Sequence, residues 1–310
     1  MSFNALAIPH RLQPDDTLIF IHIPKTAGIS FSYRLYQYFE WERIHPVPNP
    51  FVTRLRPSEG EHPAQYHPNL KAALHAATPN NPHGQPYQLV SGHYHFGVIA
   101  RFARPVAITF LREPNSRLIS NYHQAKKADD WNPFSELAQR LSLHDWLHHP
   151  QIQPHIKNLQ TRQLAGTLWG DDPEPDDATL LAQAKANLAR CAFVGLQERF
   201  EDGLLVFAYR MGWPLVTDLP KRNVGDFAPT VPSTLPQATQ AALQALNALD
   251  FELYSYATLL WNQQVTDLLE HALTGGVSPQ AAQGSTGYAK RIFEPRLRQH
   301  VIRFIQSYHP

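Results

Sequence analysis

Two strand-like segments of this chain each run into a turn that carries cationic and hydroxyl side chains. The first spans Ile21 to Phe31 (IHIPKTAGISF), with Lys25, Thr26 and Ser30 between an apolar run and a helical pattern. Such a turn directs backbone N–H groups and the positive end of a helix dipole at one point, which suits a phosphate. The alternative is an ordinary strand-to-helix turn with a surface lysine.

The order of residues in this turn differs from that of an ATP-binding P-loop. The P-loop motif is G-x-x-x-x-G-K-[ST], whereas Lys25 precedes Gly28 here. The run PVAITFL is followed by Arg112 and not by the aspartate that ATPases use to bind magnesium. An ATP-dependent kinase or nucleotide hydrolase that uses the same turn is nevertheless the enzymatic alternative.

The second turn lies in the segment from Leu111 to Tyr122 (LREPNSRLISNY). Arg112 follows a predicted strand, and Ser120 lies on the helix predicted after it. An arginine binds phosphate through two N–H groups at once, and a serine hydroxyl completes such a site. Because open α/β folds bind ligands at the carboxyl ends of parallel strands, we expect the two turns to be neighbours. A nucleotide with phosphates at both its 3′ and 5′ positions would need such a pair of sites.

These two segments resemble the two-loop signature of sulfotransferases that use PAPS (3′-phosphoadenosine 5′-phosphosulfate), specifically the family of heparan sulfate 2-O-sulfotransferase and its bacterial relatives. Asn158–Gly166 (NLQTRQLAG) and Phe193–Phe200 (FVGLQERF) also resemble segments of that family, in the same order. The resemblance covers roughly Thr17 to Trp213.

The resemblance implies roles for both turns. It implies a 5′-phosphosulfate loop formed by Lys25, Thr26, Ala27, Gly28, Ile29 and Ser30. It likewise implies that Arg112 and Ser120 bind the 3′-phosphate. Family members often carry Thr or Ser where this chain has Ile29, so one hydroxyl is missing from the loop. In sulfuryl transfer, Lys25 would stabilise the charge that develops on the leaving phosphate.

A histidine suits the removal of a proton from the acceptor hydroxyl, because its unperturbed pKa is about 6.5. In the segment SGHYHFG, His93 matches the family's catalytic histidine. Related eukaryotic enzymes carry a second histidine where this chain has Ser91. His95 shares a face with His93 if the strand continues, so it is a second candidate for catalysis or substrate binding. The alternative for both is a hydrogen-bonded structural histidine.

Two further groups of polar residues are the pair His93 and His95 and the segment NLQTRQLAG. We expect no metal, because His93 and His95 lack an evident third ligand and no H-E-x-x-H arrangement is present. In NLQTRQLAG, Arg162 could meet an anionic acceptor, while Asn158 and Gln160 could hydrogen-bond a sugar. A helix that braces the site through buried polar contacts is the equal alternative.

Strand-like runs that alternate with helical patterns predict an α/β domain with a P-loop-like central parallel sheet flanked by helices. We expect strands at 17–23, 88–91, 105–111 and 192–196, and helices at 30–41, 113–128, 134–147, 156–164, 178–190, 198–211 and 235–273, the last with a break at Asp250. Residues 1–273 would form the sulfotransferase domain, 274–287 a linker, and 288–310 a basic amphipathic C-terminal helix. That helix could pack on its own domain, form a homodimer or contact an anionic membrane surface.

Composition narrows the class of protein. The 310 residues carry 27 Lys+Arg against 26 Asp+Glu, which gives no support for binding nucleic acid. A single cysteine excludes an internal disulfide framework, and no apolar run approaches the ~20 residues that span a bilayer. The first residues also lack a secretory pattern, so we expect a cytoplasmic enzyme.

The expected partner of this enzyme is a hydroxyl-bearing acceptor, by resemblance a sugar of a glycan or glycolipid. A PAPS-binding protein without catalysis is the non-enzymatic alternative.

Overall fold

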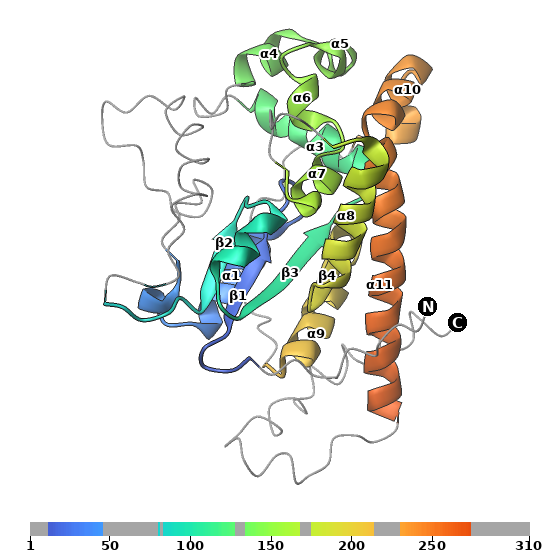
Figure 1. Cartoon of the computed structure of the whole chain (residues 1–310). Helices are drawn as coiled ribbons and strands as arrows, with labels where there is room; N and C mark the ends of the chain where they lie inside the picture. Colours follow the sequence, from blue (N-terminus) through green and yellow to red (C-terminus); the bar gives the residue numbers. More distant parts are fainter. Residues whose placement is uncertain are drawn as a thin grey trace.

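The computed structural model describes residues 12–45, 80, 83–127, 134–167, 175–213 and 230–273. Its centre is a four-stranded sheet whose neighbouring strands all run parallel, in the order β2-β1-β3-β4. The strands are β1 (Thr17–Ile21), β2 (Leu89–Gly92), β3 (Pro105–Leu111) and β4 (Phe193–Leu196). Helices flank this sheet (Figure 1), which confirms the predicted α/β fold with a central parallel sheet.

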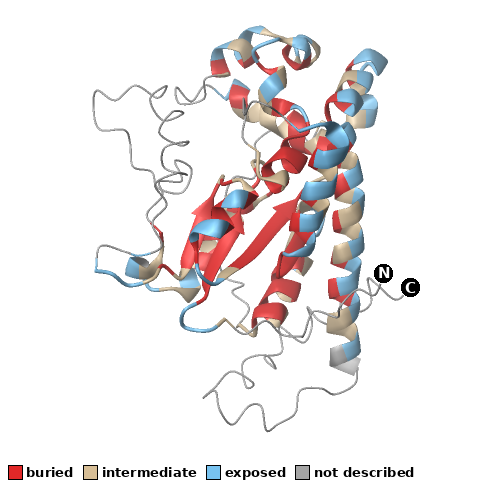
Figure 2. Ribbon diagram, in the orientation of Figure 1, coloured by how far each residue is buried: buried red, intermediate tan, exposed pale blue. Residues whose placement is uncertain are grey.

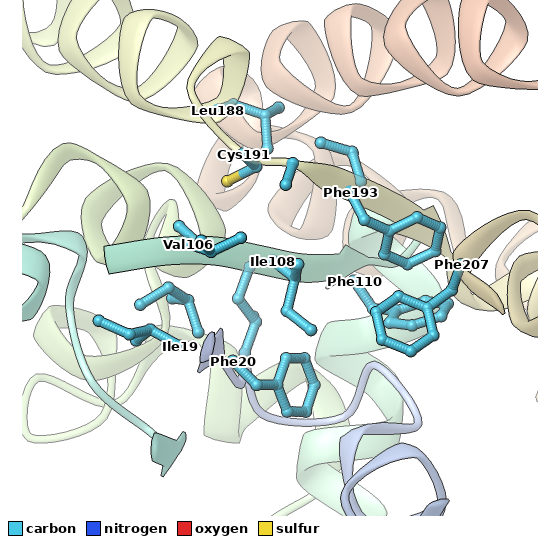
Figure 3. Packing of buried hydrophobic residues seen from close by; sticks show 14 of the residues in the cluster. Ile19, Phe20, Val106, Ile108, Phe110, Leu188, Cys191, Phe193 and Phe207 are labelled. Atoms are coloured by element: carbon cyan, nitrogen blue, oxygen red, sulfur yellow. The ribbon is translucent and has the colours of Figure 1, made fainter. Parts of the chain in front are cut away.

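The strands are apolar runs because both faces of the sheet are covered. Every residue of β1, β2 and β4 is buried (Figure 2). On one face, aromatic rings from three strands meet those of α1 (Gly28–Leu35) and α9 (Phe200–Met211). The ring of Phe110 lies 4.8 Å from Phe31 and 5.3 Å from Phe193, and Phe207 packs beside them (Figure 3). This aromatic layer fixes α1 against the sheet.

The long helix α11 (Ala248–Leu273) runs beside α8 (Asp177–Ala189) and covers the outer edge of β4 (Figure 1). Its Gln264 pairs with the main chain of Val194, accepting from the N–H at 3.1 Å and donating to the carbonyl at 2.7 Å. These bonds protect an edge strand that would otherwise expose unpaired groups.

The break predicted at Asp250 is wrong by three residues. Helix α10 (Gln237–Leu246) is capped by Asn247, whose N–H reaches the carbonyls of Leu243 and Gln244. The Asn247 side chain also donates to Asn115 of α3 (Pro114–Lys126) at 3.0 Å. Asp250 instead lies inside the first turn of α11.

Three other predicted helices are shorter than expected. Residues 134–147 form α4 (Ser135–Arg140) and α5 (Leu143–His148), because Ser142 accepts from the Asp145 N–H and starts a new helix. Residues 156–164 divide into α6 (Gln153–Ile156) and α7 (Leu159–Ala165), because Asn158 is left-handed, with φ of 47°. Residues 30–41 become α1 followed by short 3₁₀ turns at Tyr36–Tyr38 and Trp41–Arg43.

The expected linker 274–287 and C-terminal helix 288–310 lie outside the described residues, so the domain boundaries stay predictions. Within the described ranges, no helix is both long and apolar enough to cross a membrane.

Candidate functional site

The register of the sheet brings the predicted turns together at one edge. Gly92 of β2 pairs with Ile21 of β1, so His93 and His22 leave neighbouring strands side by side. β1 also pairs with β3, which ends just before Arg112. The Arg112 guanidinium donates from Nη1 to the carbonyl of Lys25 at 3.2 Å. The predicted proximity of the two cationic turns is therefore confirmed.

The turn between β1 and α1 has an unusual backbone. Lys25 and Ala27 have φ of 72° and 64°, in the left-handed region that residues with a side chain rarely adopt. The Thr26 hydroxyl is buried and donates to the Ile23 carbonyl at 2.8 Å, so it closes the turn. The half-buried Ile29 and Ser30 follow in the first turn of α1. Because the first N–H groups of a helix have no partner within it, this turn can donate several of them to an anion.

Gly28 is required for a reason that sequence reasoning missed. Its φ is not left-handed, but a Cβ atom there would overlap the imidazole ring of His22. His22 is 3% exposed and lies between Phe20 and His93, with ring centroids 5.4 and 4.2 Å away. A signal was present, since His22 directly follows β1 as His93 follows β2.

Ser91 occupies the position at which related enzymes carry a second histidine. Its buried hydroxyl lies 2.8 Å from that of Ser32 on α1. The imidazole next to His93 therefore comes from His22, on the neighbouring strand.

His93 is held in the tautomer that a base requires. Its Nδ1 lies 2.8 Å from the carbonyl oxygen of His22, and because a carbonyl only accepts, Nδ1 carries the proton. In a neutral ring Nε2 is then unprotonated. Burial lowers the pKa of His93 to about 4, and the charge of Lys25 acts in the same direction. His93 is therefore neutral near pH 7 and can accept a proton at Nε2.

The premise for placing His95 on the same face as His93 is wrong, because β2 ends at Gly92. His95 starts a 3₁₀ helix, Phe96–Arg101, where its Nδ1 accepts from the Gly97 N–H at 3.1 Å. A catalytic role for His95 stays a prediction.

Lys25 lies in an electropositive environment. Its Nζ donates to Oε1 of Gln124 on α3 at 3.1 Å, and no carboxylate of the described residues pairs with it. Burial, followed by the charges of Arg112 and Lys127, lowers the pKa of Lys25 to about 8. Ser120 lies one helical turn before Gln124, so both lie on the same face of α3. This cluster fits a bound anion, whose charge would offset the repulsion.

Arg112 is half-buried, and its backbone is held by the side chain of Gln160. Gln160 of α7 accepts from its N–H at 3.0 Å and donates to its carbonyl at 2.9 Å. Nε of Arg112 is buried and has no hydrogen-bond partner in the described structure, so a ligand could use it. Burial lowers the pKa of this guanidinium, against the raising effects of Glu198 and Glu113.

The structure favours the bracing interpretation of NLQTRQLAG. Gln160 contacts the main chain of Arg112, and Asn158 accepts from the Leu249 N–H at 3.0 Å. Arg162 donates to the Pro154 carbonyl at 3.1 Å. All three side chains are buried. Across the described ranges, no group of three or more His, Cys, Asp or Glu side chains could hold a metal ion.

Known proteins are similar in sequence to the part of the chain that contains this site. Residues 10–257 fit the family model described as "Sulfotransferase family". Heparan-sulfate 6-O-sulfotransferase 2 of Danio rerio is 25% identical over 289 residues, which covers 83% of this chain and 60% of that protein. Galactose-3-O-sulfotransferase 3 of Bos taurus is 27% identical (77% and 55% covered), and uronyl 2-sulfotransferase of Mus musculus is 27% identical (56% and 47% covered). The chain thus spans about half of the length of these relatives.

Proposed function

Because the chain belongs to the sulfotransferase family, we propose that it transfers a sulfuryl group from PAPS to a hydroxyl group and releases adenosine 3′,5′-bisphosphate. The observation that carries this proposal is the meeting of Lys25, Arg112 and His93 at one edge of the sheet, inside the matched region 10–257. Two cationic groups and a neutral base are what a doubly phosphorylated donor and a hydroxyl acceptor require.

The chain's own residues divide the work. When bound, PAPS supplies the activated sulfuryl group. His93 accepts the acceptor's proton at Nε2, while its Nδ1–H stays on the His22 carbonyl. The Lys25 ammonium and the N–H groups at the start of α1 stabilise negative charge on the departing 5′-phosphate. Arg112 and Ser120 hold the 3′-phosphate and so orient the donor.

For the acceptor we propose a sugar hydroxyl on a glycan or glycolipid. The relatives are named for transfer to heparan sulfate, galactose and uronyl residues, all of them carbohydrate. Their names give three different positions of sulfation, so they support the class of acceptor and not the carbon.

Binding is tested by calorimetric titration of the full chain with adenosine 3′,5′-bisphosphate in the presence of a metal chelator. We expect wild-type binding that Arg112→Ala weakens at least tenfold. Arg140→Ala is the matched control, because Arg140 is exposed and pairs with Glu136. If wild type does not bind the bisphosphate but binds ATP once magnesium is restored, the kinase alternative replaces the proposal.

Turnover is tested with radiolabelled PAPS and a panel of glycans. We expect labelled product from wild type and a ~10²–10⁴-fold lower rate of product formation from His93→Gln. Tight bisphosphate binding without His93-dependent product on any acceptor would favour the non-catalytic alternative.

A further inference from the structure

Helix α7 contacts the main chain of both halves of the site through two buried glutamines. Gln160 pairs with both the N–H and the carbonyl of Arg112, at 3.0 and 2.9 Å. Gln163, one turn later, donates to the carbonyls of His22 and Tyr94 at 3.0 and 2.7 Å. Gln160 therefore holds the end of β3, whereas Gln163 joins the end of β1 to the segment that follows β2.

These contacts involve Arg112 of the proposed donor site and the backbone on either side of the proposed base, His93. Gln160 acts on the residue whose guanidinium is assigned to the 3′-phosphate. Gln163 acts on the carbonyl of His22, which also accepts the Nδ1–H of His93, and on Tyr94, the next residue after His93. The two glutamines thus contact different residues of the site, Gln160 only Arg112 and Gln163 both His22 and Tyr94, although both lie on the same short helix.

The start of α7 is itself anchored to α11. The carboxylate of Asp250 accepts from the backbone N–H groups of Gln160 and Thr161 at 3.2 and 2.8 Å, and from the Thr161 hydroxyl at 2.7 Å. Asp250 and Thr161 are fully buried. A carboxylate at this position satisfies N–H groups that have no partner within the helix and complements its dipole. Because α7 is anchored in this way, its glutamines present their amides at set positions.

We propose that Gln160 and Gln163 are positioning residues with separate tasks: Gln160 sets Arg112 for the donor's 3′-phosphate, and Gln163 sets the tautomer and orientation of His93. The proposal rests on the proposed function. Removing the Gln160 amide leaves the N–H and carbonyl of Arg112 without their partner, so this strand end and its guanidinium shift. Removing the Gln163 amide loosens the carbonyl that fixes the His93 ring.

The test for Gln160 compares two nucleotides on the full chain. Adenosine 5′-monophosphate lacks the 3′-phosphate, so its affinity relative to adenosine 3′,5′-bisphosphate isolates the contribution of that group. Methionine replaces glutamine at similar volume and keeps helix propensity. We expect Gln160→Met to lower the preference for the bisphosphate about tenfold, or about 1.4 kcal/mol. Gln163→Met, the matched control, should leave this preference within about twofold.

The test for Gln163 reads the His93 ring by nitrogen NMR, with its signals identified by their loss in His93→Gln. Wild type and Gln160→Met should show the Nδ1–H tautomer alone. Gln163→Met should show a mixture of the two tautomers. Thermal unfolding checks that each variant is folded. If methionine prevents folding, the same comparison is made with Gln160→Ala and Gln163→Ala, in which water can enter the vacated space.

The outcomes distinguish failure of the division of tasks from failure of the proposed function. If both variants change both readouts, or neither variant changes either, α7 is a structural brace and the division of tasks is overturned. If wild type binds the bisphosphate no more tightly than the monophosphate, the proposed function fails, and the role of Gln160 fails with it.

Discussion

Binding of adenosine 3′,5′-bisphosphate should make Lys25 take up a proton above pH 8. Burial and the nearby cations Arg112 and Lys127 lower the pKa of Lys25 to about 8 in the free protein. A phosphate at the β1–α1 turn would supply the opposite charge and raise that pKa again. Binding and protonation are therefore linked, and each favours the other.

The size of the effect follows from that pKa. At pH 9 only about one Lys25 side chain in ten is protonated in the free protein, and nearly all would be protonated if the anion restored the ordinary pKa of 10.5. Uptake should then approach ~0.9 proton per nucleotide bound. Between pH 8 and 10.5 the Kd should rise by up to tenfold per unit, a total of about 3 kcal/mol at ~1.4 kcal/mol per pKa unit.

Titration calorimetry in buffers of different ionisation enthalpy measures this uptake directly. The series should start above pH 7.5, where the nucleotide's phosphates, with a second pKa of about 6, are fully ionised. Lys25→Arg is the matched control, because arginine stays charged throughout the range. An uptake below ~0.2 proton by wild type at pH 9, or equal uptake by Lys25→Arg, would show that Lys25 does not take up the proton.

Three further predictions concern His93, Gly28 and Asp250. His93→Gln should lower the transfer rate ~10²–10⁴-fold while bisphosphate affinity measured by calorimetry stays within about twofold, and a parallel loss of affinity would contradict a role as base. Gly28→Ala should lower the free energy of unfolding in urea by about 1–3 kcal/mol, since the new methyl group overlaps His22. His22→Ala in the same chain should recover part of that loss, whereas simple additivity would argue against the contact. Asp250→Ala should cost about 3 kcal/mol or more in the same assay because it leaves buried N–H groups unsatisfied, and exposed Asp177→Ala should change stability by no more than ~0.5 kcal/mol.

Much of the fold could be predicted because the sheet is buried on both faces. A fully covered strand must be apolar along its whole length, so β1 and β3 were recognisable as runs, and β3 has the predicted bounds 105–111. The proximity of Lys25 and Arg112 followed from the rule that parallel strands end at one edge. Neither inference needed a contact between residues distant in the chain.

The helix boundaries depended on such contacts. α10 is capped by Asn247, whose side chain reaches Asn115, and α7 begins after Asn158, whose N–H bonds to the Leu246 carbonyl. Local helical patterns continue across both positions, so periodicity alone predicted no break there. A hydrogen bond to a residue 80 or more positions away left no mark in the local pattern.

Residue types and their order were enough to identify the apolar strands, the cationic turns and the histidine that follows β2. Contacts between distant parts of the chain were needed to place His22 against His93 and to place Gln160 and Gln163 on the main chain of the site. The physical reason is that residue type sets which bonds a side chain can make, whereas the register of β1 with β2 and the placement of α7 by Asp250 set which partner lies within reach.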